Sequence, residues 1–268
     1  TANFITNCMI RNAITISDCL PKIDRNYPVT IYDADSISIL RAFSGIIANE
    51  LTKSNQQLQD RGSQDPQLRD STPTLELCCN TLNDLLSQKT KHLFSDQIID
   101  IILNREIHIA MMALALDYHI ELALPFSNLF ITIWKKYSKL YIQRLYELYD
   151  KGILHSLSSP NPHQIERTCQ ILNHLTSEPQ LFVDLFVNFD CDKSGRFVSL
   201  FDNTVSLVSK HAYPDDPCQF SALTVLFNIL KCMWHYLNTT KTSEVPVTET
   251  LIEAKRQKDV FQQGLDLF

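Results

Sequence analysis

The residues most suggestive of chemistry lie at positions 190–201, where the sequence is DCDKSGRFVSLF. Four of them match the opening of a calcium-binding EF-hand loop, namely Asp190, Asp192, Ser194 and Gly195. Such a loop needs a bidentate Glu at its twelfth position, because calcium takes six or more oxygen ligands. Phe201 occupies that position here. The pattern therefore favours a polar turn whose carboxylates cap helices, and calcium binding is the less favoured alternative.

Other reactive residue types do not form a catalytic or metal-binding pattern. The eight histidines include no His-x-x-x-His pair, and His108 and His119 are too far apart to be ligands on neighbouring helical turns. The sequence has no nucleophile elbow, Walker loop or dinucleotide fingerprint. Cys78 and Cys79 lie in an apolar stripe, which indicates packing rather than nucleophilic catalysis. We therefore expect no catalytic residues, no metal site and no cofactor.

Composition narrows the class of partner. The net charge is −6 and no strongly basic block occurs, so we expect no nucleic-acid binding. The eight cysteines form no Cys-x-x-Cys pair and mostly fall within apolar helical patterns, which is typical of reduced cysteines in a cytosolic protein. No apolar run reaches the roughly 18 residues that a transmembrane helix requires.

A basic stretch beside aromatic residues offers one further binding hypothesis. Lys135, Lys136 and Lys139 neighbour Trp134 and Tyr137. Such a group could contact an anionic membrane. The favoured interpretation is a solvated face of a long helix, because lysine stems commonly lie along apolar surface while their ammonium groups stay in water.

The elements that must position these residues are helices. Apolar residues recur at helical spacing along most of the chain, and only five glycines occur. The sequence predicts a mainly apolar central helix at 106–118 and the longest helix from after Pro125 to about Asp150, with Gly152 as its end. A later helix is expected to carry its apolar stripe on leucines and a methionine: Leu223, Leu226, Leu230, Met233 and Leu237.

The predicted fold class is all-α, as an armadillo- or HEAT-like helical superhelix of antiparallel helix pairs. A globular helical bundle is the alternative. The polar stretch 53–72 is expected to be a mobile loop, because it carries too few apolar residues to bury.

Three stretches resemble one protein family. Residues 180–192, QLFVDLFVNFDCD, resemble the signature box of the domain named "homology upstream of Sec-seven" (HUS) in large Arf guanine-nucleotide exchange factors, with Phe189 where the family usually has Tyr. Residues 205–214 are similar to the helix and turn that follow the box, nearer the Golgi (GBF/Gea) subfamily. Residues 253–268 are similar to the entry to the exchange domain, nearer the BIG subfamily. The subfamily is left open.

The resemblance implies a domain organisation. We expect residues 1–32 to be a linker and helix from an upstream region, 33–238 to be the HUS-type armadillo-like domain, and 239–268 to be a linker and helix leading into an exchange domain that lies outside this chain. The fragment is then not an enzyme by itself, although its parent would release GDP from Arf.

The resemblance also implies partners and a location. The partners are the upstream dimerisation and cyclophilin-binding domain of the same protein, Arf-family or related small GTPases, and the surface of Golgi or endosomal membranes. The location is cytoplasmic, with peripheral association with Golgi and trans-Golgi membranes. The function implied is regulatory scaffolding in vesicle trafficking. The alternative is a generic armadillo or HEAT interaction adaptor outside this family.

The box residues have roles that their chemistry suggests. Asn188 can end a helix in left-handed geometry. Asp190 and Asp192 can accept N–H bonds from the turn or from the next helix start. Phe189 and Cys191 can fill the groove between helix pairs. The box is then an internal staple of the fold or, alternatively, a direct contact for the upstream domain.

Overall fold

The computed structural model describes residues 40–52, 72–87, 103–192 and 197–239. The described residues form helices and connecting turns without a strand, which confirms the all-α class. Only five glycines in the chain and long apolar repeats at 3.6-residue spacing account for this outcome. The chain divides into two compact units between His174 and Leu175.

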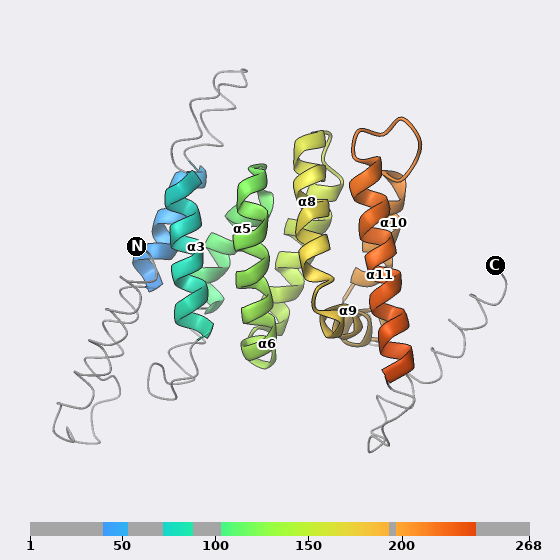
Figure 1. Ribbon diagram of the computed structural model, residues 1–268. Coiled ribbons are helices and arrows are strands. Elements are labelled where there is room, and N and C mark those ends of the chain that lie inside the picture. The colour runs from blue at the N-terminus through green and yellow to red at the C-terminus, as the bar shows by residue number, and fades with distance from the viewer. Residues whose placement is uncertain (1–39, 53–71, 88–102, 193–196, 240–268) are drawn as a thin grey trace, which may run out of the picture. The chain divides into compact units, whose positions relative to one another are not determined.

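The first unit is built around the long helix α6, which packs against α3 and α5 (Figure 1). Phe126, Phe130 and Tyr149 lie in its core with 0% exposure, because aromatic residues on the inner face of α6 and of the turn after it meet the neighbouring helices. A helix at 40–52 precedes the labelled elements. These are α3 (Thr72–Ser87), η2 (Leu103–Ile107), α5 (His108–Leu116), η3 (Ile120–Leu122), α6 (Ala123–Leu148), η4 (Tyr149–Leu154), α7 (His155–Leu157) and α8 (Pro162–Leu175).

The second unit places α11 against both α9 and α10, while η5 packs on α9 and α10. Pro179 begins α9, as expected from its fixed φ and missing N–H, which suit a first helical position. The elements are α9 (Pro179–Leu185), η5 (Phe186–Asp190), α10 (Leu200–Lys210) and α11 (Gln219–Thr239).

Two predicted helix limits are wrong. The long helix does not begin after Pro125, because α6 begins at Ala123 and includes this proline. Pro125 falls in the first turn, where its missing N–H leaves no helical hydrogen bond unmade. Gly152 does not end the following helix, since the backbone continues through it as the π-helical η4. A Cβ atom on Gly152 would lie 2.7 Å from the Cβ of Ala115, so this glycine permits the close approach of η4 and α5.

The central-helix prediction for 106–118 holds only in part. Ile107, Met111 and Leu114 are fully buried, but Ile109 is 55% exposed. Helix α5 therefore buries one side and leaves another open, although its sequence is apolar on both. An apolar pattern on all sides of a helix does not by itself place every residue in the core.

Several predictions fall outside the described residues. These are the N-terminal region 1–32, and all but one residue each of the loop predicted at 53–72 and of the segment predicted at 239–268. The two exceptions contradict the predicted limits, because Thr72 begins α3 and Thr239 ends α11. The HUS-type domain at 33–238 spans both compact units, and its limits stay a prediction.

Candidate functional site

Residues 188–192 follow the short helix α9, where the backbone widens into the π-helical η5. The predicted left-handed end at Asn188 is wrong, because Asn188 lies exposed within the π-helical turn. Among the described non-glycine residues only Asp215 has a positive φ, of 76°. The helix instead ends with the N–H of Cys191 donating to the carbonyl of Phe186 at 3.0 Å. The wider turn carries the helix on to Asp190.

Asp190 caps the following helix, as predicted from its side chain. Its two carboxylate oxygens accept the N–H groups of Phe201 and Asp202, each at 2.9 Å. These donors lie in the first turn of α10, where backbone N–H groups have no partner within the helix. Ser199 at the N-cap position makes no side-chain cap bond, so Asp190 supplies the cap from the preceding element. Partial burial raises the pKa of Asp190, and the two backbone bonds oppose that shift.

Phe189 fills the space beneath this cap. It is 2% exposed, and its ring meets that of Phe197 edge to face at 5.2 Å between centroids. Phe186 and Phe201 make a second edge-to-face pair at 5.8 Å. Cys191 is half-buried. Phe189 and Phe201, which adjoin Asp190 in the chain and across its hydrogen bond, thus each belong to one of these aromatic pairs.

The calcium alternative gains no support from this geometry. Both oxygens of Asp190 already accept N–H bonds from α10. Ser194 and Gly195 lie outside the described residues, and Asp192 is half-buried. Across the described ranges, no cluster of three or more His, Cys, Asp or Glu side chains could hold a metal ion.

Part of the lysine and aromatic stretch at 134–139 on α6 bonds the C-terminal end of α3, so this stretch is not a wholly solvated face. Trp134 is only 4% exposed and points into the core. The Tyr137 hydroxyl donates to the carbonyl of Leu86 at 3.1 Å, and the Lys136 ammonium donates to the carbonyls of Leu86 and Ser87. A positive charge at a helix C-terminus is favourable, because the last carbonyls have no helical partners.

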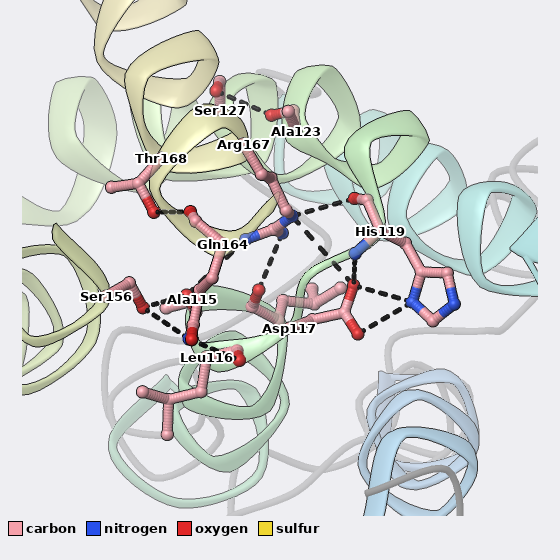
Figure 2. Close-up of polar contacts among 11 residues, drawn as sticks. Ala115, Leu116, Asp117, His119, Ala123, Ser127, Ser156, Gln164, Arg167 and Thr168 are labelled. Atoms are coloured by element: carbon pink, nitrogen blue, oxygen red, sulfur yellow. Dashed lines mark hydrogen bonds and ion pairs between the residues drawn. The ribbon is translucent and has the colours of Figure 1, made fainter. Parts of the chain in front are cut away.

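A polar cluster surrounds Arg167 on α8, whose side chain is fully buried (Figure 2). Its guanidinium donates to the carbonyls of Leu114 at 2.7 Å and His119 at 2.9 Å. It also lies 3.5 Å from the carbonyl oxygen of Ala115 and 5.9 Å from the ring centroid of Phe126. Desolvation lowers the pKa of Arg167 to about 10, which still leaves the side chain charged at neutral pH.

Neighbouring side chains complete the capping of α5. The Ser156 hydroxyl donates to the carbonyl of Ala115 at 3.0 Å, and the Gln164 amide donates to the carbonyl of Leu116 at 3.0 Å. The last carbonyls of α5 are thus bonded by side chains from α7 and α8. A cation at this end also complements the negative end of the helix dipole.

Asp117 joins the cluster from the turn after α5. The carboxylate is fully buried and accepts the backbone N–H and the Nδ1 of His119, both at 2.9 Å. Its Oδ2 lies 4.0 Å from the Nε of Arg167. The hydrogen bond to Asp117 raises the pKa of His119, and burial opposes it. The arrangement closes the turn between α5 and α6 and holds it on α8.

Sequence reasoning missed this cluster. Ile165, Cys169 and Leu172 recur at helical spacing in the sequence of α8, and all three are buried. Arg167 is on the opposite side of the helix and is buried as well, together with Ile171. Ile171 indicates that α8 has a second apolar side. Arg167 lies on that side, but an arginine in a helix ordinarily indicates a side chain exposed to solvent.

The cysteines offer no activated nucleophile in the described part of the chain. Cys78, Cys169 and Cys232 form no disulfide and are buried, as expected. Burial raises the pKa of the Cys79 thiol to about 12. A thiol in this state is protonated at neutral pH and is therefore a poor nucleophile.

The candidate interaction surface lies on α11, and the predicted stripe of this helix is partly wrong. Leu223 and Leu230 were expected in the core but are 47% and 56% exposed. The side chains of α11 that pack inward are instead small or β-branched, namely Ala222, Val225, Ile229 and Cys232. A helix with apolar residues on two opposite sides can bury either one, and the smaller residues allow closer packing.

The outer side of α11 forms a continuous apolar row. Its five members, called the α11 surface below, alternate at spacings of three and four residues: Phe220, Leu223, Phe227, Leu230 and Trp234. Phe220 is 82% exposed, and Phe227 and Trp234 are each 66% exposed. Lys231 is the only charged residue in α11. An apolar row of this length on an exposed helix marks an interaction site more often than a solvent-facing side.

No helix in the described ranges combines the length and hydrophobicity needed to cross a lipid bilayer. Three features are thus candidates for a functional role, namely the Asp190 cap, the buried Arg167 cluster and the exposed α11 surface. Each lies within one of the two units. Comparisons with protein-family models, with curated proteins and with solved structures find no match to this chain.

Proposed function

We propose that this chain is a non-catalytic regulatory and scaffolding segment of a large Arf guanine-nucleotide exchange factor, working through helix-mediated contacts with protein. The observation that carries the binding role is the α11 surface, an exposed row of five large apolar side chains. The family assignment rests on the resemblance of residues 180–192, 205–214 and 253–268 to the HUS region and its exit.

The α11 surface is suited to a protein partner by its chemistry. Burying one large apolar side chain is worth about 1.5–3 kcal/mol, so covering several of them supports stable association even after the cost of ordering. The row has the spacing that receives a second helix, because apolar residues at alternating three and four positions form one straight seam. A membrane surface would be served better by basic residues beside the row than by the single Lys231.

In the proposed parent, the helices continue an armadillo-like superhelix. The partners are the upstream dimerisation and cyclophilin-binding domain, Arf-family or related small GTPases, and Golgi or endosomal membranes reached peripherally. The Asp190 cap supports an organising role for the box, since the carboxylate fixes the start of α10. A generic helical adaptor is the second candidate, favoured by the α11 surface alone.

Transcript sequencing past the codon for Phe268 separates the two candidates. An exchange domain should follow in the same reading frame, and the longer protein should accelerate GDP release from Arf. A transcript that continues into unrelated sequence, or a longer protein without exchange activity, would remove the family assignment. The adaptor candidate would then stand, because the α11 surface does not depend on the family.

A further inference from the structure

A helix with a matching apolar row is the occupant that fits the α11 surface best. The surface is a single line of side chains on one helix, from Phe220 to Trp234. A line of this kind is covered most completely by a second helix laid along it, whose own apolar residues recur at three and four positions.

The chain itself supplies such a segment directly after α11. That helix ends at Thr239, and residues 240–268 follow it. Within them apolar residues take the same alternating spacing, at Leu251, Ala254, Phe261, Leu265 and Phe268. Lys258 occupies the one remaining position of the row. Its aliphatic stem can lie along apolar surface while the ammonium group stays in water.

The connection between the two rows has a suitable length. Residues 240–248 are polar for the most part and include Pro246, which disfavours continuation of α11. Helix–helix connections in compact proteins commonly span about 2–8 residues, so a stretch of this size allows the chain to reverse. A short tether also gives its two ends an effective concentration in the millimolar range.

We propose that residues 249–268 dock in antiparallel orientation on the α11 surface of the same chain. Gly264 disfavours an isolated helix, so helix formation in this segment depends on docking. The docking deepens the proposed function and rests on it only in treating the α11 surface as a binding surface. A partner that uses this surface must first displace the segment, which makes residues 249–268 an internal competitor.

Trp234 is the built-in reporter of this docking. It is 66% exposed on the described part of the chain, whereas Trp134 is 4% exposed and thus shielded from a soluble quencher. Acrylamide quenching of the full chain therefore reports whether Trp234 is covered. The test compares the unsubstituted chain with a variant carrying Phe261→Asp and Leu265→Asp.

The proposal predicts that Trp234 resists quenching in the unsubstituted chain and becomes accessible in the variant. Loss of two apolar contacts should weaken docking by about tenfold or more. The matched control carries Gln262→Asp and Gln263→Asp, which add the same charges beside the row and should leave quenching unchanged.

A second measurement reads the same contact from the other side. Phe227→Asp on α11 should raise the rate of trypsin cleavage at Lys255. The increase should equal that in the segment variant, which carries Phe261→Asp and Leu265→Asp. Equal quenching of Trp234 in the unsubstituted chain and the segment variant would overturn the docking. So would protection of Trp234 that rises with protein concentration alongside dimer formation, because a second copy would then cover the surface. Neither result bears on whether an exchange domain follows Phe268.

Discussion

Replacing Arg167 by Met should destabilise the first unit severely, because the arginine holds the end of α5 in place. The substitution removes the donors to the carbonyls of Leu114 and His119, which lie 2.7 and 2.9 Å away. Each carbonyl keeps a backbone donor, from Asp117 to Leu114 at 3.3 Å and from Leu122 to His119 at 3.2 Å. The loss is therefore that of the hydrogen bonds from a charged group, each worth about 1.5–3 kcal/mol. Removing one partner of a buried charge pair typically costs about 3–5 kcal/mol, and we expect a loss of this size.

Several contacts limit the loss to that range. Asp117 keeps its hydrogen bonds from His119, and the carbonyl of Ala115 keeps its bond from Ser156. Methionine keeps an unbranched stem that can fill the inner part of the Arg167 site, although it lacks the guanidinium carbon and its two terminal nitrogens. The predicted effect therefore comes from the lost donors and the lost charge.

Urea unfolding of the full chain measures the effect. Trp134 lies in the same unit and is 4% exposed, so its fluorescence reports the unfolding of that unit. The control is Arg144→Met, which removes an arginine that is 41% exposed and bonded to Glu147 at 2.6 Å. An exposed pair of this kind is worth about 0–1 kcal/mol.

The two variants must separate clearly. If Arg167→Met lost less than about 1 kcal/mol, or no more than Arg144→Met, the backbone N–H groups of Asp117 and Leu122, together with water, would suffice for these carbonyls. The buried arginine would then not be what holds this helix end, and its position would be incidental to stability.

Three further predictions concern other residues. Asp190→Ala should lower the thermal stability of the second unit by about 1 kcal/mol, because α10 loses its cap; unchanged melting with lost binding to the upstream domain would identify Asp190 as a direct contact instead. The raised pKa of His119 means that its stabilisation is full below the ordinary value of 6.5 and is lost as pH rises through the folded pKa. His119→Gln should flatten this decline in the free energy of unfolding, measured with urea at several pH values. His108 should show the opposite trend, because burial lowers its pKa and its contribution to stability is lost as pH falls below 6.5. His108→Gln should remove that trend. Gly152→Ala should cost about 1–3 kcal/mol in the same assay, since the added Cβ would meet the Cβ of Ala115 at 2.7 Å; a stability equal to that of the unsubstituted chain would show that η4 moves aside freely.

The helices of this protein were predictable because each carries at least one apolar stripe. Leu75, Cys78 and Leu82 repeat at helical spacing and are buried at 2% exposure or less. The Asp190 cap was predictable as well, because an aspartate ahead of a helix can satisfy its free N–H groups. Local patterns of this kind depend on nearby residues and can be recognised without coordinates.

The side of α11 that packs inward was not predictable from the stripe alone. Leucines on one side and smaller residues on the other make both sides apolar, and the choice depends on which neighbour is present. The Arg167 cluster was hidden for a related reason. Its acceptors are backbone carbonyls some 50 residues earlier in the chain, and these leave no trace in side-chain patterns.

The Arg167 cluster also affects how the protein forms during synthesis. The donors from α8 are separated from their acceptors at the end of α5 by 48 to 53 residues. At about 5–20 residues per second, a ribosome needs roughly 3–10 s to make that stretch. During this interval the last turn of α5 has the backbone N–H of Asp117 and later the hydroxyl of Ser156 as donors, but it lacks those of α8. The nascent chain therefore exposes an incompletely capped helix end until α8 emerges. Codons that slow translation between α5 and α8 should therefore lengthen the period in which chaperones can bind.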